Sequence, residues 1–149
     1  MLKKGAADHP KSTVVSDIDG TILLTTKAAT LLWRLSRLFE TLGRLYQRPN
    51  QRVLQRIHTA RKVLILTSRD ATESALTLRQ LRRAGLDNPK VVFCRRETLY
   101  FDWKLKVLSE LNDSEGLVWI DDAIGTQGER DLIRELGSRV EPIDPSSLK

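Results

Sequence analysis

Apolar residues occur in two alternating patterns along this chain. Continuous apolar runs bounded by polar residues predict buried strands, and they occur at 13–16, 63–66, 91–94, 117–120 and, more weakly, 139–143. Between these runs, apolar residues recur at every third or fourth position, which predicts amphipathic helices near 28–45, 50–61, 71–85, 103–111 and 129–136. Residues 20–27 predict a turn, with a short hairpin around Leu23 and Leu24.

Strands and helices alternate throughout, and the strands are continuously apolar. This combination is typical of a mostly parallel sheet that helices bury on both faces. We therefore expect an α/β fold, a Rossmann-like three-layer sandwich with a sheet of about five strands. The length of 149 residues fits one domain, at 12–144. Residues 1–11 and 145–149 are polar, and we expect them to be flexible termini.

The composition is that of a basic protein without disulfides. The net charge is +6, and the single cysteine, Cys94, excludes an internal disulfide and fits a reducing compartment. The first residues lead into no apolar segment and no run reaches membrane length, so we expect a cytoplasmic protein without a membrane partner. The positive charge fits either a polyanionic partner or ordinary solvated helix faces.

Polar side chains follow three of the predicted strands. Because the carboxyl ends of parallel strands lie along one edge of a sheet, these side chains should lie close together. Lys104 begins the helix that follows the strand at 91–94 and adds an ammonium group. The polar residues at the three strand ends are Asp17, Asp19, Thr67, Ser68, Asp121 and Asp122.

This edge has the groups that phosphoryl transfer needs. Carboxylates this close repel one another unless a cation relieves them, and Mg²⁺ binds a few carboxylate oxygens together with substrate phosphate. A hydroxyl and a lysine suit the remaining phosphoryl oxygens. One aspartate can attack phosphorus, and a second can transfer the proton. An EF-hand calcium loop is excluded, because its sixth and twelfth positions hold Ile22 and Ala28.

Four segments resemble the motifs of the haloacid dehalogenase (HAD) superfamily of phosphotransferases, in the same order. Residues 17–21, Asp-Ile-Asp-Gly-Thr, resemble the first motif, and 63–67 the second. Lys104 resembles the third, although Lys106 is a rival, and 120–122 resemble the fourth. The resemblance covers about residues 13–125 and implies a Mg²⁺-dependent phosphatase with an aspartyl-phosphate intermediate.

The resemblance also implies a role for each matching residue. Asp17 would be the nucleophile, and Asp19 would be general acid and then base, with its backbone carbonyl on the metal. Thr67 would bind the phosphoryl group and Lys104 would neutralise it. Asp122 would be the direct Mg²⁺ ligand with Asp121 beside it, and the reverse order of that pair stays open. The residues expected nearest the substrate are Thr67, Ser68, Arg69, Gly20 and Thr21.

No segment is long enough for the cap domain that many members of this family carry. The resemblance then implies an open site, which a macromolecular substrate or a second subunit closes. Arg69 follows Thr67-Ser68 as in some phosphatase domains of nucleic-acid end-repair proteins, although a solvated arginine fits as well. The alternative function is a basic nucleic-acid-binding or regulatory module with little catalysis. The candidate basic patch is Arg34, Arg37, Arg44, Arg48, Arg52, Arg56 and Arg61.

Overall fold

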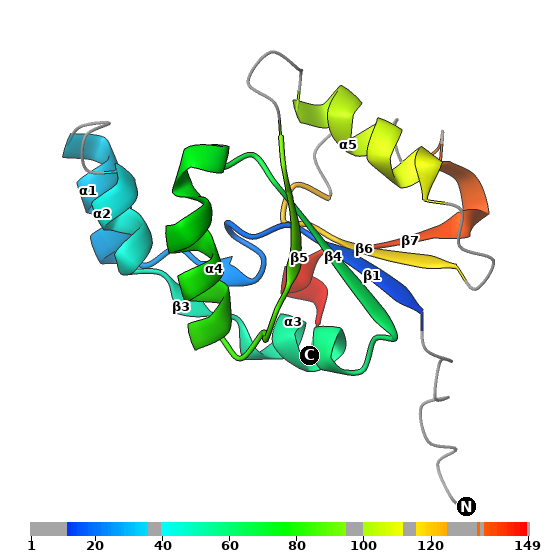
Figure 1. Cartoon of the computed structure of the whole chain (residues 1–149), viewed down its shortest axis with the longest axis horizontal. Helices are drawn as coiled ribbons and strands as arrows, with labels where there is room; N and C mark the ends of the chain where they lie inside the picture. The colour runs from blue at the N-terminus through cyan, green and yellow to red at the C-terminus, as the bar shows by residue number, and fades with distance from the viewer. Residues whose placement is uncertain are drawn as a thin grey trace, which may run out of the picture.

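A parallel five-stranded sheet forms the centre of the molecule (Figure 1). The computed structural model describes residues 12–35, 40–94, 100–111, 116–124, 134 and 136–148. The strand order is β5-β4-β1-β6-β7, and every pairing is parallel. The predicted strands are therefore confirmed, with the bounds β1 Thr13–Ser16, β4 Lys62–Thr67, β5 Lys90–Phe93, β6 Leu117–Ile120 and β7 Val140–Ile143.

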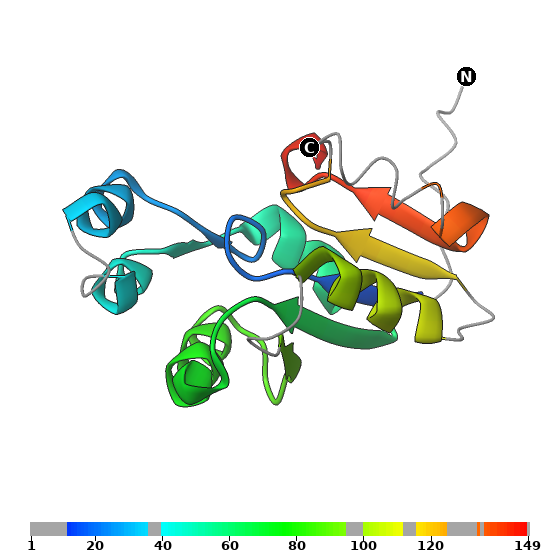
Figure 2. The ribbon, with the colours of Figure 1, turned by 90° about the horizontal axis from the view of Figure 1, so that it is seen from above.

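Helices cover both faces of this sheet (Figures 1 and 2). Helices α3 (Gln51–His58) and α4 (Ser74–Arg83), the latter preceded by the 3₁₀ turn η2 (Ala71–Glu73), pack on one face, and α5 (Tyr100–Glu110) packs on the other. Neighbouring strand residues supply both cores, since Val14 packs toward α3 and Val15 toward α5. The Rossmann-like three-layer α/β sandwich is confirmed, and the described residues contain no cap domain.

Between β1 and α3 the chain leaves the sheet. Strand β2 (Leu23–Leu24) pairs with β3 (Arg48–Pro49) in an antiparallel ribbon, and beyond it α1 (Lys27–Leu35) and α2 (Glu40–Leu45) lie against each other (Figure 2). The predicted single helix over 28–45 and the local hairpin at Leu23 are both wrong. Two short helices pack closely because Gly43 admits the Trp33 indole, which a Cβ would overlap.

The apolar stripe expected to face the core is largely exposed on this α1–α2 pair. Leu31, Leu35, Leu42 and Leu45 are 60, 64, 45 and 53 % exposed. The pair stands away from the sheet (Figure 2), so its stripe has no sheet surface to cover. Within the described residues, no helix combines the length and apolarity needed to cross a membrane.

The C-terminal end continues past β7 (Val140–Ile143) into a further 3₁₀ turn. After the 3₁₀ turn η3 (Gly137–Arg139) and β7, residues Pro145–Ser147 form the 3₁₀ turn η4, with Asp144 accepting the Ser146 N–H at 2.8 Å. Pro145 is buried, and Arg52 of α3 donates to the Leu148 carbonyl at 2.9 Å. Residues 145–148 therefore contact the rest of the fold, and the flexibility expected of 145–149 stays a prediction. Residues 1–11 and most of the helix predicted at 129–136 lie outside the described residues.

Candidate active site

The carboxyl ends of three neighbouring strands bring the predicted site residues together. Ser16, the last residue of β1, is in register with Ile65 of β4 and with Ile120 of β6. Asp17 follows Ser16 directly, and its N–H donates to the Ile120 carbonyl at 3.0 Å. Asp121 therefore leaves β6 beside Asp17, as the parallel arrangement predicts.

Three carboxylates form an acidic cluster at this edge. Asp17, Asp121 and Asp122 each place an oxygen within 4.8 Å of the others. Asp17 and Asp121 are buried, while Asp122 keeps solvent access. Partial burial, and then the charge of Asp121, raises the pKa of Asp122. A bound cation would offset the repulsion that Asp122 meets from Asp121, and an all-oxygen donor set fits Mg²⁺.

A buried lysine neutralises one member of this cluster. Lys104, on α5, is 1 % exposed, and its ammonium group donates to Oδ2 of the fully buried Asp121. The other carboxylate oxygen of Asp121 accepts the Ala123 N–H at 3.1 Å. Lys104 Nζ also lies 5.9 Å from the centre of the Trp119 ring. Its rival Lys106 is exposed, so Lys104 is the lysine of the pair that reaches the acidic cluster.

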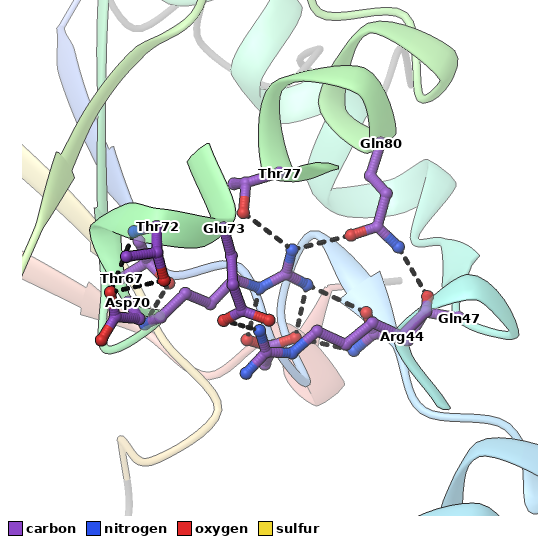
Figure 3. A network of polar contacts seen from close by, with 10 residues as sticks. Arg44, Gln47, Thr67, Asp70, Thr72, Glu73, Thr77 and Gln80 are labelled. Carbon is purple, nitrogen blue, oxygen red and sulfur yellow. Dashed lines mark hydrogen bonds and ion pairs between the residues drawn. The ribbon is translucent and has the colours of Figure 1, made fainter. Parts of the chain in front are cut away.

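A buried arginine holds the second acid of the first motif. Arg69 is 1 % exposed, and its Nε and Nη2 donate to the two carboxylate oxygens of Asp19 at 2.9 and 2.7 Å. Its other donations go to Gln47, Thr77 and Gln80 at 2.7 to 3.2 Å (Figure 3). A guanidinium has five N–H donors, and these five bonds use them all. The solvated arginine expected as one alternative is wrong.

This ion pair controls the charge of Asp19. Burial acts to raise its pKa, but the hydrogen bonds and charge of Arg69, with the Gln47 amide, outweigh it and hold the pKa below its ordinary value. Gln47 touches both members, because it donates to Asp19 at 2.7 Å and accepts from Arg69 at 2.9 Å. Asp19 is therefore held in its ionised form, and its carboxyl is a poor proton donor.

Gly20 and Thr21 hold two loops of the site together. Gly20 has a φ of +79°, and a Cβ there would overlap the Asp122 carboxylate. Thr21 is fully buried, and its hydroxyl accepts the Asp122 N–H at 3.0 Å. The glycine thus lets the loop after β1 approach Asp122, and the threonine fixes the backbone of Asp122 in place.

Thr67, the last residue of β4, and Ser68, which follows it, lie in different environments. Thr67 is fully buried, and its hydroxyl accepts the Arg69 N–H at 3.1 Å. Ser68 is exposed. Thr67 therefore shapes the turn that directs Arg69 inward, and Ser68 faces solvent.

Comparisons of the chain with protein-family models, with curated proteins and with solved structures found no significant match.

Sequence reasoning missed the residues that surround Arg69. Gln47 follows α2, far along the chain from Asp19, while Thr77 and Gln80 lie on the inner side of α4. None of the three belongs to a recognisable motif. The Gln80 amide also donates to the Arg44 carbonyl at 2.5 Å, which ties the end of α2 to α4.

The candidate basic patch is divided in the structure. Arg44 is buried and pairs with Glu73, so it adds nothing to an exposed patch. Arg56 is half-buried, and Arg37 lies outside the described residues. The members that remain exposed are Arg34, Arg48, Arg52 and Arg61.

Proposed function

We propose that this protein is a Mg²⁺-dependent phosphomonoester hydrolase that works through an aspartyl-phosphate intermediate. The observation that carries the proposal is the acidic cluster of Asp17, Asp121 and Asp122, within 4.8 Å of one another, with the buried Lys104 beside it. A phosphatase of this type needs a carboxylate nucleophile, a cation site and a fixed positive side chain in one place. The resemblance of the four motifs to the HAD superfamily supports the same function.

The three carboxylates fit Mg²⁺ with different roles. Asp121 already has Lys104 on one oxygen and the Ala123 N–H on the other, whereas Asp122 keeps solvent access. We therefore assign Asp17 and Asp122 as direct ligands and Asp121 as the group beside them. When bound, Mg²⁺ would offset the charge of the phosphoryl oxygens and of the attacking carboxylate.

The reaction would have two steps. A carboxylate oxygen of Asp17 attacks phosphorus, and the bond from phosphorus to the ester oxygen breaks, so that the leaving oxygen takes a proton from Asp19. Water then attacks the phosphorus of the aspartyl-phosphate and gives its proton to Asp19. That step frees Asp17 and inorganic phosphate. Lys104 would stabilise the negative charge on Asp17 and the phosphoryl group in both steps.

Arg69 opposes the first of these steps. It lowers the pKa of Asp19, so the protonated carboxyl that must donate to the leaving oxygen is seldom present. Leaving groups that need no proton should therefore react faster. We expect nitrophenyl phosphate to be hydrolysed faster than an alkyl phosphate of similar size.

Phosphate release from nitrophenyl phosphate tests this function. We expect turnover with Mg²⁺, none with excess chelator, and none in Asp17→Asn under either condition. Asp87→Asn is the matched control, because Asp87 is an exposed aspartate outside the cluster. Turnover in Asp17→Asn equal to wild type, or turnover unaffected by chelator, would contradict the proposal.

A further inference from the structure

A cavity of about 710 Å³ opens directly beside the acidic cluster. Gly20 and Asp122 are among its lining residues, so the cavity is continuous with the proposed reaction centre. The lining also includes Arg48 of β3, Asn50, and Arg52 in the first turn of α3. Its volume lies in the range of small-molecule sites. The leaving group of a bound phosphomonoester could therefore extend into this cavity.

Two arginines give part of the cavity lining a positive charge. Arg48 is exposed, and Arg52 donates from one guanidinium nitrogen to the Leu148 carbonyl and is also exposed. The first residues of α3 line the cavity too, and the first N–H groups of a helix have no partner within the helix. Besides Asp122, the acidic residue Asp144 lines the cavity, but its carboxylate accepts from the Ser146 N–H and hydroxyl.

The side chain of Asn50 also points to a bound ligand, in addition to the arginines and the helix N-terminus. The residue is 9 % exposed and lines the cavity, and its side chain makes no capping hydrogen bond to α3. Among the described residues, no group pairs with this amide. A buried amide normally finds a partner, because a buried polar group without one destabilises the fold. A bound anion would accept from the Asn50 amide, the helix N–H groups and both arginines.

We propose that this cavity binds a second phosphate, carried on the leaving group of the substrate. The inference rests on the proposed hydrolase function and narrows its substrate class to phosphomonoesters with a further phosphate. Two arginines and a helix N-terminus are the groups that bind phosphate most readily in proteins. Asp122, through the cation, would serve the phosphate to be cleaved, and Arg48, Arg52 and the N-terminus of α3 would hold the other.

The test compares substrates that differ by one phosphate. Adenosine 3′,5′-bisphosphate is compared with adenosine 3′-monophosphate, and fructose 1,6-bisphosphate with fructose 1-phosphate. We expect kcat/KM to favour the bisphosphate of a pair by about tenfold, as one charge-assisted contact would give. Arg48→Ala, Arg52→Ala and Asn50→Asp should each lower that preference, whereas Arg83→Ala, at an exposed arginine of α4, should keep it. Equal kcat/KM within both pairs, or a preference that the three variants leave unchanged, would overturn the inference.

A binding measurement separates this inference from the hydrolase proposal. In Asp17→Asn, calorimetric titration with adenosine 3′,5′-bisphosphate and with fructose 1,6-bisphosphate requires no turnover. If either bisphosphate binds, and adding Asn50→Asp weakens its affinity about tenfold, the result supports phosphate binding in the cavity even if no phosphate is released. Absence of binding by both bisphosphates overturns it even if nitrophenyl phosphate is hydrolysed. Asn50→Asp keeps the size and shape of the side chain, and aspartate is equally suited to the position before a helix, so a folded variant is expected.

Discussion

Replacing Arg69 by methionine should destabilise the protein through Asp19. The change keeps a long apolar side chain but removes all five donated hydrogen bonds and the positive charge. Breaking a buried ion pair from one side costs about 3–5 kcal/mol. The Asp19 side chain is 31 % exposed, so water replaces part of the loss, and we expect the lower end, about 3 kcal/mol.

Urea unfolding at several pH values measures this loss and its cause. The folded pKa of Asp19 lies below its unfolded value. The ion pair therefore contributes fully above the unfolded pKa, near 3.9, and its contribution disappears as the pH falls through the folded pKa. The gap between wild type and Arg69→Met should be widest near neutral pH and should narrow in acid.

Two further variants test whether Arg69 stabilises the protein through Asp19. Arg69→Lys keeps the charge but loses the paired geometry, so its stability should lie between wild type and Arg69→Met. The double variant Asp19→Asn, Arg69→Met should lose less stability than the sum of the losses of the two single variants, because either change alone already removes the ion pair. A wild-type stability for Arg69→Met, or a gap that is the same at every pH, would refute the reasoning.

The other predictions concern the acidic cluster and its neighbouring loop. Lys104→Met should lower the free energy of urea unfolding by about 3–5 kcal/mol, because Asp121 stays buried without the lysine ammonium group. A smaller loss than that of an exposed lysine variant such as Lys106→Met would contradict this. Gly20→Ala should cost at least about 1–2 kcal/mol from the positive φ alone, and overlap with Asp122 should also abolish turnover; wild-type kcat would show that the loop tolerates a side chain. The raised pKa of Asp122 means that the metal-free protein loses stability as the pH rises through that pKa. Protons and Mg²⁺ compete for this carboxylate, so the rise in Tm on adding Mg²⁺ should become larger as the pH increases over the same range. In Asp122→Asn this rise in Tm should no longer depend on pH. An equal rise at every pH in wild type would argue against Asp122 as a ligand.

The features that follow from local pattern and topology were predictable from the sequence. Continuous apolar runs correspond to strands buried on both faces, because such strands have no solvent-facing residues. Parallel order then places their carboxyl ends together, which is why Asp17 and Asp121 were expected side by side and are found so. These inferences require no knowledge of long-range side-chain contacts.

The features that depend on long-range packing were not predictable. The leucines of α1 and α2 have the same spacing whether they form one helix on a sheet or two helices on each other. The burial of Arg69 depends on Gln47, which the β2–β3 ribbon returns to the site from far along the chain. The sequence around Pro145 and Ser146 does not indicate a contact with α3. In the structure, Arg52 of α3 donates to the Leu148 carbonyl.

The most direct test of the central claim is to identify the residue that carries the phosphoryl group during turnover. The protein would be mixed with Mg²⁺ and nitrophenyl phosphate, quenched in acid within one turnover, digested, and analysed by mass spectrometry. We predict one phosphoryl group on the peptide that contains Asp17, and none on that peptide in Asp17→Asn. Phosphate release without phosphorylation of Asp17, or phosphorylation of a different residue, would contradict the account.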